Sequence, residues 1–343
     1  MTTRDIWEPA APLSRLAPAE PVSTPEISVV VPVLDEEENI PTLYERLTEV
    51  LGSLGVPYEI IVVDDGSRDR SFALLRERAA NDRRLRVVRL RRNFGQTAAF
   101  TAGFERALGD VVITIDADLQ NDPADIPRLL EQIDSGFDVV SGWRKNRQDA
   151  FLSRTLPSRL ANGLISWATG LRLHDYGCSL KAYRREVVQD LQLYGELHRF
   201  IPAIASWQGV SVAELPVNHS PRRFGTSKYG IGRTLRVVLD LLTVRFLLSY
   251  STRPMQIFGL IGLVCAALGG LILAYLGFVR IVLAEPIAAR PLTLLGVLMT
   301  MLGMQFVSIG LLGELIVRVV NSGRRSTAYR VREELNPAPL TLE

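Results

Sequence analysis

Two pairs of acidic residues have the spacing and surroundings of a cation or nucleotide site. Asp116 and Asp118 follow an apolar run rich in Val and Ile, and Asp64 and Asp65 follow another such run. Side chains two residues apart on an extended strand point to the same side, so Asp116 and Asp118 are predicted to share one hard divalent cation. Gln120 adds a neutral oxygen two residues further on. A cation held by this group could be shared with a diphosphate.

Asp64 and Asp65 open the run Asp-Asp-Gly-Ser, for which two interpretations stand together. Asp and Ser often cap helices and turns, because their side chains accept hydrogen bonds from nearby backbone N–H groups. A carboxylate at the end of a strand can also reach inward and hydrogen-bond a nucleobase or a ribose. The sequence leaves both roles open.

The motifs of several other enzyme classes are absent from the sequence. No Gly-x-Gly-x-x-Gly follows the first predicted strand and no Gly-x-x-x-x-Gly-Lys-Ser/Thr occurs, which argues against dinucleotide enzymes and Walker ATPases. His-Glu-x-x-His, Cys-x-x-Cys and Gly-x-Ser-x-Gly are also missing, so neither a zinc centre nor a hydrolase elbow is indicated. The formal net charge is only +2, and the arginines of residues 83–92 alternate with apolar residues. Nucleic-acid binding is therefore not expected.

Strand-like and helix-like segments alternate through the first half of the chain. Amphipathic stretches at 40–54 and 69–81 separate short runs rich in Val and Ile, and a last short strand is expected at 212–217. This alternation predicts an α/β fold, with a mostly parallel sheet flanked by helices. Ligands of such sheets bind at the carboxyl ends of the strands, where the acidic pairs stand. The other predicted strands cover residues 27–32, 59–64, 85–90, 111–116 and 138–141.

Two long uncharged segments lie near the end of the chain. Residues 257–279 and 292–313 comprise 23 and 22 residues without a charge, longer than buried core helices usually are. Each is long enough to cross about 30 Å of hydrocarbon. The connecting segment 280–291 holds two arginines, fewer than the segments that flank the pair. The positive-inside rule therefore predicts two transmembrane helices with both outer ends in the cytoplasm.

The remaining segments complete a five-part organisation. Residues 1–25 contain five prolines and no signal-peptide core, which predicts a disordered leader. Residues 231–253 are amphipathic, which favours an interfacial helix on the membrane over a helix packed on its own domain. The predicted parts are a leader at 1–25, an α/β domain at 26–230, an interfacial segment at 231–253, a transmembrane hairpin at 254–320 and a cytoplasmic tail at 321–343.

Six motifs stand in a fixed order along the chain. They are VPVLDEEENI at 31–40, DDGS at 64–67, RNFGQ at 92–96, DADLQNDP at 116–123, DYGCSLKAYRR at 175–185 and HSPRRFGTSKY at 219–229. In this order they resemble the motifs of the polyprenyl-phosphate glycosyltransferases, a group of family 2 glycosyltransferases. The chain is similar to dolichol-phosphate mannosyltransferase and, more closely, to the bacterial enzymes that load a sugar onto undecaprenyl phosphate. The resemblance extends from about Ile27 to Arg325.

The resemblance implies a fold, a reaction and a location. The fold would be of GT-A type, followed here by interfacial helices and two transmembrane helices. The reaction would be an inverting, metal-dependent transfer with Mg²⁺ or Mn²⁺, from a nucleotide-diphosphate sugar, expected to be UDP-linked, to a polyprenyl phosphate such as undecaprenyl phosphate. The enzyme would work at the cytoplasmic face of the cell inner membrane, in contact with membrane lipids and as a homo-oligomer.

The resemblance also assigns residue roles. Pro32, Glu36 and Asp65 would line the nucleoside site, and Asp116, Asp118 and Gln120 would hold the metal and the donor diphosphate. Asp175 is the implied catalytic base. The residues implied for phosphate and acceptor binding are Arg144, Arg154, Ser158, Arg222, Ser227 and Lys228. Where the family usually has Tyr-Asn before the glutamate, this chain has Leu-Asp, so the base-stacking aromatic is missing and the nucleobase stays open.

Asp175 has two further interpretations beside that of a base. The acceptor is a phosphate monoester with a second pKa of about 6, so at neutral pH it is mostly dianionic and already nucleophilic. Asp175 would then orient the acceptor or an arginine, or it is an ordinary structural carboxylate.

Three alternative functions differ from this interpretation in sequence features. A sugar nucleotidyltransferase would carry a basic Gly-rich loop after the first strand, where this chain is acidic. A processive polysaccharide synthase would carry Gln-x-x-Arg-Trp, which is absent. An inactive membrane scaffold descended from a glycosyltransferase would keep the Asp motifs, so only an activity measurement separates it from the enzyme.

Overall fold

A computed structural model gives the structure of the chain. It describes residues 24–145, 163, 166, 170–189, 191, 193, 197–207, 209–221, 254–283, 286, 290–322 and 329–338. The predicted interfacial segment 231–253 and nearly all of the predicted leader lie outside the described residues.

The centre of the fold is an eight-stranded mixed sheet in the order β7-β5-β6-β4-β1-β2-β3-β8. Parallel pairs join β1 to β2, β1 to β4, β2 to β3 and β5 to β7, whereas β6 runs antiparallel between β4 and β5, and β8 antiparallel along β3. The predicted α/β fold with a mostly parallel sheet is confirmed. The strands are β1 (Ile27–Val33), β2 (Tyr58–Asp64), β3 (Leu85–Leu90), β4 (Val111–Thr114), β5 (Val139–Trp143), β6 (Lys181–Arg184), β7 (Val212–Pro216) and β8 (Val331–Leu335).

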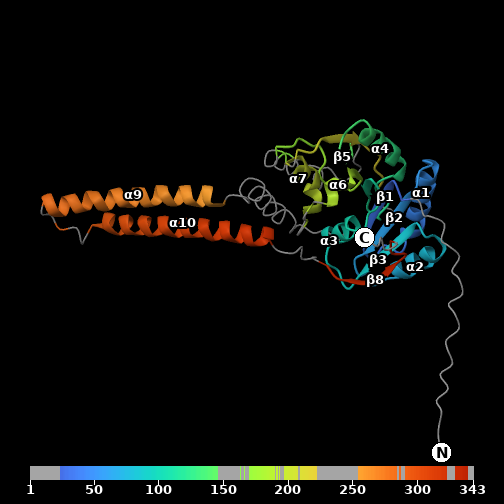
Figure 1. Cartoon of the computed structure of the whole chain (residues 1–343), viewed down its shortest axis with the longest axis horizontal. Helices are drawn as coiled ribbons and strands as arrows, with labels where there is room; N and C mark the ends of the chain where they lie inside the picture. Colours follow the sequence, from blue (N-terminus) through green and yellow to red (C-terminus); the bar gives the residue numbers. More distant parts are fainter. Residues whose placement is uncertain are drawn as a thin grey trace, which may run out of the picture.

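Helices cover both faces of the sheet (Figure 1), and each face has its own apolar core. One core includes Leu47 of α1, Phe72 of α2 and Leu129 of α4, and the other includes Phe100 of α3 and Ile201 of α7. α1 forms because its buried residues recur at helical spacing and a proline stands in its first turn. The helices of this domain are α1 (Ile40–Ser53), α2 (Ser71–Asn81), α3 (Gln96–Phe104), α4 (Ile126–Asp134), α6 (Arg185–Gln189) and α7 (Ile201–Trp207), with short 3₁₀ turns at Pro123–Asp125 and Leu197–Phe200.

Two long helices, α9 (Pro254–Val282) and α10 (Pro291–Ser322), form a hairpin that projects from the α/β domain (Figure 1). Their apolar segments Met255–Val282 and Pro291–Ile316 have mean hydropathies of 2.5 and 1.9, and 17% of each is buried. Such exposure is unlike that of a core helix, and the two helices are candidate membrane spans. Glycines permit close packing, because a Cβ at Gly262 would lie 2.7 Å from the carbonyl oxygen of Gly303.

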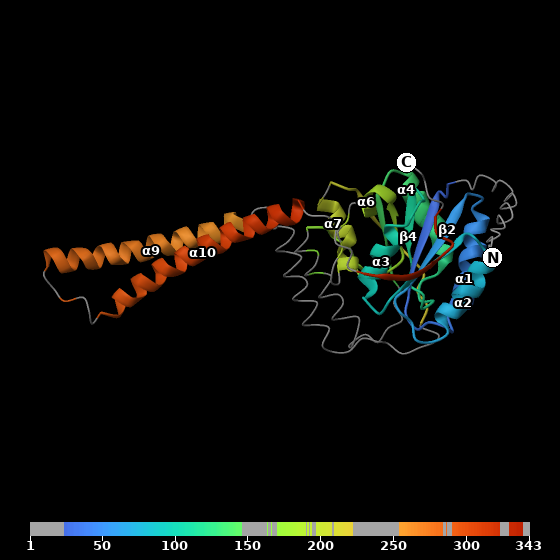
Figure 2. The same cartoon turned by 60° about the horizontal axis from the view of Figure 1, so that its bottom comes forward.

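Beyond α10 the chain returns to the sheet as β8, a strand within the segment 321–343 that the sequence analysis assigned to a cytoplasmic tail. Both carboxylate oxygens of Glu333 accept from the Nη2 atom of Arg76 on α2, at 2.8 and 3.0 Å. Asn336 donates its side-chain N–H groups to the carbonyl oxygens of Ala79, Asp82 and Leu85. In Figure 2, β8 runs across the α/β domain beside the strands near the N-terminal helices. The chain therefore leaves the α/β domain before α9 and returns to its sheet after α10.

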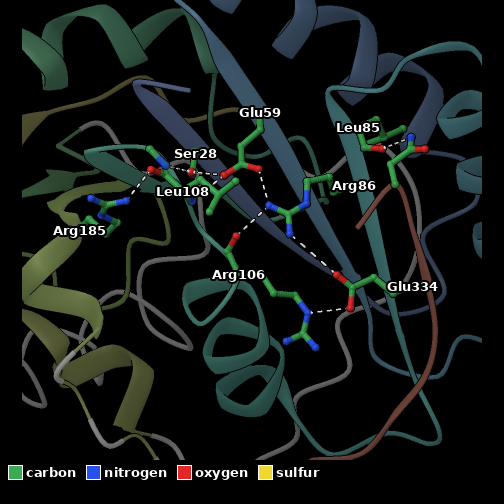
Figure 3. Close-up of polar contacts among 10 residues, drawn as sticks. Ser28, Glu59, Leu85, Arg86, Arg106, Leu108, Arg185 and Glu334 are labelled. Atoms are coloured by element: carbon green, nitrogen blue, oxygen red, sulfur yellow. Dashed lines mark hydrogen bonds and ion pairs between the residues drawn. The ribbon is translucent and has the colours of Figure 1, made fainter. Parts of the chain in front are cut away.

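A cluster of buried polar residues lies near the amino ends of the central strands (Figure 3). We call Ser28, Glu59, Arg86, Arg106 and Glu334 the basal network. The Glu59 carboxylate accepts from the Ser28 hydroxyl at 2.6 Å, from Arg86 at 2.6 Å and from the Leu108 N–H at 2.8 Å. Arg86 also donates to the carbonyl oxygen of Arg106 and lies 3.8 Å from Glu334, which Arg106 contacts at 3.1 Å. The network joins β1, β2 and β3 to β8.

Candidate active site

The acidic pairs meet at one edge of the sheet. β1, β2 and β4 run parallel, so the residues that follow them emerge together at the carboxyl edge. Asp65 donates its backbone N–H to the carbonyl oxygen of Val33, and the segment after β4 carries Asp116 and Asp118. The predicted convergence of the two pairs is thus a consequence of strand direction.

Asp116 and Asp118 form the acidic centre of the site. Burial, followed by the neighbouring Asp118 carboxylate, raises the pKa of Asp116 from 3.8 to about 6. The Gln96 side-chain amide donates to the Asp116 carboxylate at 2.7 Å, and the Ser179 hydroxyl accepts the Asp116 backbone N–H at 3.3 Å. A second carboxylate that raises the pKa of Asp116 favours the binding of a cation between the two.

The donor set fits a divalent cation that is shared with a substrate. Among the described residues, no group of three or more His, Cys, Asp or Glu side chains could hold a metal ion by itself. Mg²⁺ is commonly held by one or two carboxylates together with substrate phosphates, so a pair of aspartates beside a diphosphate is a sufficient set. Asp118 is only 7% exposed, so a bound cation would also compensate the unfavourable burial of its negative charge.

Backbone contacts fix the loop that carries this pair. Gln120 donates its backbone N–H to the Asp118 carboxylate at 3.2 Å, and its carbonyl oxygen accepts from the Ser220 N–H at 2.9 Å. Asn121 donates to the Ser179 hydroxyl at 2.8 Å and forms an isolated bridge with His219. The acidic loop is therefore held from two sides, by the turn before β6 and by the segment after β7.

The residues predicted for a nucleoside site surround the ends of β1 and β2. The Asp65 carboxylate accepts the N–H groups of Phe94 and Gly95 at 2.7 and 2.9 Å, and burial raises its pKa. The Asp64 carboxylate accepts the Ser67 N–H at 2.8 Å. These contacts give both aspartates the turn-stabilising role, and they bring the loop after β3 beside the site.

A cavity of about 370 Å³ opens beside these turns. It is lined by Leu34, Asp35, Gly66, Arg68, Arg91, Arg92 and Asn93. Asp35 accepts the Arg68 N–H at 2.8 Å, and Gly66 has a φ of 79° with its α-carbon against the backbone of Arg92. Glu36 accepts a hydrogen bond from the Asn39 side chain at 2.6 Å, and Pro32 lies within β1 opposite Val63.

Arg144 and Asp175 form a bidentate ion pair. The Arg144 Nε and Nη2 atoms donate to the two Asp175 oxygens at 2.6 and 3.0 Å, and the Gly177 N–H donates to the same carboxylate at 3.0 Å. Although burial disfavours the charged guanidinium, these hydrogen bonds raise the pKa of Arg144 above its ordinary value. Four residues after Asp175 the same segment carries Ser179, whose hydroxyl accepts the Asp116 backbone N–H at 3.3 Å, so the ion pair adjoins the acidic centre.

Cys178 and Lys181 are buried behind the ion pair, and the sequence analysis gave neither a role. Burial raises the pKa of Cys178 to about 12, so its thiol is protonated at neutral pH. Burial lowers the pKa of Lys181 to about 8, and its ammonium group donates to the carbonyl oxygen of Tyr176 at 3.2 Å. The motif at 175–185 contained both residues, but no sequence spacing indicates which of its side chains are buried.

The predicted site residues are brought together only in part. The nucleoside, metal and ion-pair groups share the carboxyl edge of the sheet. The other residues predicted to bind phosphate or acceptor lie outside the described residues, namely Arg154, Ser158, Arg222, Ser227 and Lys228.

Comparison with known proteins identifies the family. Residues 28–192 match the family model Glycosyl transferase family 2. Dodecaprenyl-phosphate galacturonate synthase of Rhizobium johnstonii is 44% identical over 318 residues, which cover 92% of this chain and 94% of the relative. Undecaprenyl-phosphate 4-deoxy-4-formamido-L-arabinose transferase of Pectobacterium carotovorum is 45% identical over 318 residues, covering 92% of this chain and 95% of the relative.

A solved structure supports the fold. Glucosyl-3-phosphoglycerate synthase from Mycobacterium tuberculosis, in complex with Mn²⁺ and uridine-diphosphate-glucose, superposes with a TM-score of 0.51 at 21% identity. The similarity covers 64% of this chain and 79% of that chain, and it confirms the predicted GT-A type of fold. The family model and the two relatives show that the chain belongs to glycosyl transferase family 2 and, within it, to the polyprenyl-phosphate glycosyltransferases.

Proposed function

We propose that this chain transfers a sugar, with inversion, from a UDP-linked donor to a polyprenyl phosphate such as undecaprenyl phosphate. The observation that carries the proposal is the acidic centre of Asp116 and Asp118 beside the Arg144–Asp175 ion pair. Negative and positive groups are thereby placed around one position, as the transfer of a sugar away from a diphosphate requires. Two relatives named for transfer to polyprenyl phosphates support the acceptor class.

A divalent cation, Mg²⁺ or Mn²⁺, would be held by Asp116 and Asp118, with Gln120 adjoining. When bound, it would neutralise the diphosphate that departs from the sugar. Mn²⁺ and uridine-diphosphate-glucose in the structure of the mycobacterial synthase support this cation class and a uridine donor. The cavity beside Asp35 and Arg68 is the place proposed for the nucleoside.

Asp175 is proposed to orient Arg144 during the reaction. Both carboxylate oxygens already accept hydrogen bonds, from Arg144 and Gly177. These bonds disfavour protonation of Asp175 and therefore a role as the base. The acceptor phosphate is mostly dianionic at neutral pH and needs little help from a base. The Arg144 guanidinium has five N–H donors, of which the bonds to Asp175 use two, so others remain for a substrate phosphate.

Membrane placement follows from the two connections of the hairpin. α9 begins after the α/β domain and α10 leads back to β8 in the same sheet. If α9 and α10 cross the membrane, both outer ends lie on the face where the domain lies. We propose the cytoplasmic face of the inner membrane, as the arginine distribution predicts. A tag inserted at Pro286 should be reachable from outside intact cells, and a tag after Ala338 only after permeabilisation.

A transfer assay with the full chain in detergent tests the proposed function. Undecaprenyl phosphate would be incubated with Mn²⁺ and labelled UDP-galacturonate, UDP-4-formamido-arabinose or UDP-glucose, and lipid-linked label would be extracted. At least one donor should yield a lipid-linked product that disappears on chelation of the metal. The same protein preparation should first be shown to bind UDP. If it binds UDP but yields no product from any donor tested, the result would contradict the proposal and favour the inactive scaffold.

A further inference from the structure

Glu214 on β7 holds the chain on which Asp175 stands. β7 pairs with β5 in parallel, with Glu214 opposite Ser141, and the Val217 N–H continues the pairing to the Trp143 carbonyl oxygen. One Glu214 oxygen accepts the backbone N–H groups of His174 and Asp175 at 2.8 and 3.0 Å. The other oxygen contacts His174 Nδ1 at 2.7 Å. A single carboxylate thus fixes two consecutive backbone units.

Through His174, Glu214 is also connected to the residue that precedes Arg144, the other member of the ion pair. The His174 ring stacks on Trp143, with ring centroids 4.3 Å apart and planes inclined by 20°. We call Trp143, His174 and Glu214 the clasp. Arg144 follows Trp143 in the chain and Asp175 follows His174. The clasp therefore joins the residues that directly precede the two partners of the ion pair.

We propose that Glu214 is a positioning residue for sugar transfer, which acts through Asp175 on Arg144. This inference rests on the proposed function. Its basis is that Glu214 is the acceptor for the Asp175 N–H, while the Asp175 carboxylate holds the guanidinium in a bidentate arrangement. Displacement of Asp175 would misdirect Arg144 when charge develops on the departing diphosphate. Interactions that strengthen in the transition state act on kcat more than on donor KM.

The chain supplies a matched control on the same strands. Asp138, just before β5, accepts the N–H and the hydroxyl of Ser211, just before β7, at 2.8 and 2.7 Å. It links the starts of β5 and β7 to each other, whereas the Glu214 carboxylate links β7 to His174 and Asp175. If Glu214 only stabilised this part of the sheet, Asp138→Ala and Glu214→Ala would have similar effects.

The test compares transfer kinetics of full-length variants in detergent. Glu214→Ala should lower kcat by about 30- to 100-fold, as expected for small misplacements of reacting groups, with donor KM changed less than about 3-fold. Glu214→Gln should stay within about 5-fold of wild type, because its amide oxygen can still accept both backbone N–H groups. Asp138→Ala should leave kcat unchanged. Equal kcat for Glu214→Ala and Asp138→Ala, or a Gln variant as impaired as the Ala variant, would overturn the inference.

Two further measurements separate this inference from the proposed function. When Glu214→Ala is added to Asp175→Asn, kcat should fall by less than about 3-fold further, because the effects of residues that act through one another are not additive. Full additivity would contradict the route through Asp175. If the wild type transfers no sugar, the proposed function fails. Backbone hydrogen exchange still tests whether Glu214 holds the segment of His174 and Asp175 in place. Residues 174–177 should exchange faster in Glu214→Ala than in Asp138→Ala, and equal rates would refute the positioning role.

Discussion

Glu59 and Asp116 are carboxylates at opposite ends of the same sheet, and their surroundings differ in charge. Glu59 of the basal network is 4% exposed and has a hydroxyl, a guanidinium and a backbone N–H as donors. Asp116 accepts from the neutral Gln96 amide and stands beside a second carboxylate, which contributes to its raised pKa. The basal carboxylate has its cation within the fold, whereas the acidic centre carries negative charge suited to a cation from outside.

This comparison separates a structural from a functional polar cluster. A buried carboxylate with a matched guanidinium is costly to disturb but has no remaining capacity for a ligand. A buried carboxylate whose pKa is raised by a neighbouring carboxylate, as at Asp116, is costly to keep charged, and such groups are typical of functional sites. Variants at the two ends should therefore affect different quantities.

Removal of the basal cation should have the largest effect on stability. Arg86→Met leaves Glu59 buried without its guanidinium, with side-chain exposures of only 6% and 5% in the native pair. The free energy of unfolding should fall by about 3–5 kcal/mol. Arg84→Met is the control, because Arg84 pairs with Asp82 at the surface and should cost less than about 1 kcal/mol. Thermal unfolding measures both, and kcat of the folded Arg86 variant should equal that of wild type.

Loss of charge from the acidic centre should act on the reaction instead. Asp118→Asn keeps the shape of the side chain but removes a charge beside the proposed cation. Transfer should fall by about 10²- to 10³-fold, similar to loss of one electrostatic contact to a transition state, while the melting temperature is retained. Asp122→Asn provides a nearby control, since its side chain caps a short turn by accepting the Ala124 N–H. Activity of wild type in excess EDTA, or full turnover of Asp118→Asn, would remove the distinction between the two ends.

The pH dependence of stability should show the strain at Asp116 in the metal-free protein. Its pKa is raised to about 6, so between pH 4 and 6 the folded protein binds more protons at this site than the unfolded chain does. The contribution of Asp116 to stability therefore falls as pH rises through this window. Asp116→Asn should match wild type near pH 4 and melt at a higher temperature above pH 6. If the difference in melting temperature between the variant and wild type were constant across this range, the pKa of Asp116 would not be raised in the folded protein.

Weakening of the link between β8 and the basal network should have the smallest effect. Glu334 is partly exposed and contacts Arg106 and Arg86. Glu334→Gln should lower the free energy of unfolding by about 0.5–1.5 kcal/mol, the usual contribution of one hydrogen bond. Thermal unfolding of the full chain checks this value. A loss as large as that of Arg86→Met would show that β8, rather than the Glu59–Arg86 pair, controls stability at this end.

The sequence predicted the acidic centre because its signal is local. Asp116 and Asp118 follow a Val- and Ile-rich strand, and parallel strands bring their carboxyl ends to one edge. The contacts of Glu214 could not be predicted in this way, since His174 and Asp175 lie 40 and 39 residues away in the chain and no periodic pattern joins them. The ion pair of Arg144 and Asp175 likewise spans 31 residues, and only the family resemblance suggested its two members.

β8 was missed for a different physical reason. Its sequence Val-Arg-Glu-Glu-Leu contains three charged residues in five, which is unusual for a strand considered in isolation. The charges of Glu333 and Glu334 are satisfied by residues of distant segments, Arg76 and Arg106, so the strand is stabilised by its partners rather than by its own composition. The two arginines of β3 are likewise paired across the sheet, Arg86 with Glu59 and Arg89 with Asp64.

The position of β8 has a consequence for the order in which the protein is made. Residues 331–335 pair with β3, whose own residues leave the ribosome before both hydrophobic helices do. Until then, one side of β3 has no strand beside it and offers unpaired N–H and C=O groups to other chains. The sheet can therefore be completed only after α10 has been synthesised. Biogenesis of the hairpin thus sets how long a nascent copy stays open to aggregation at β3.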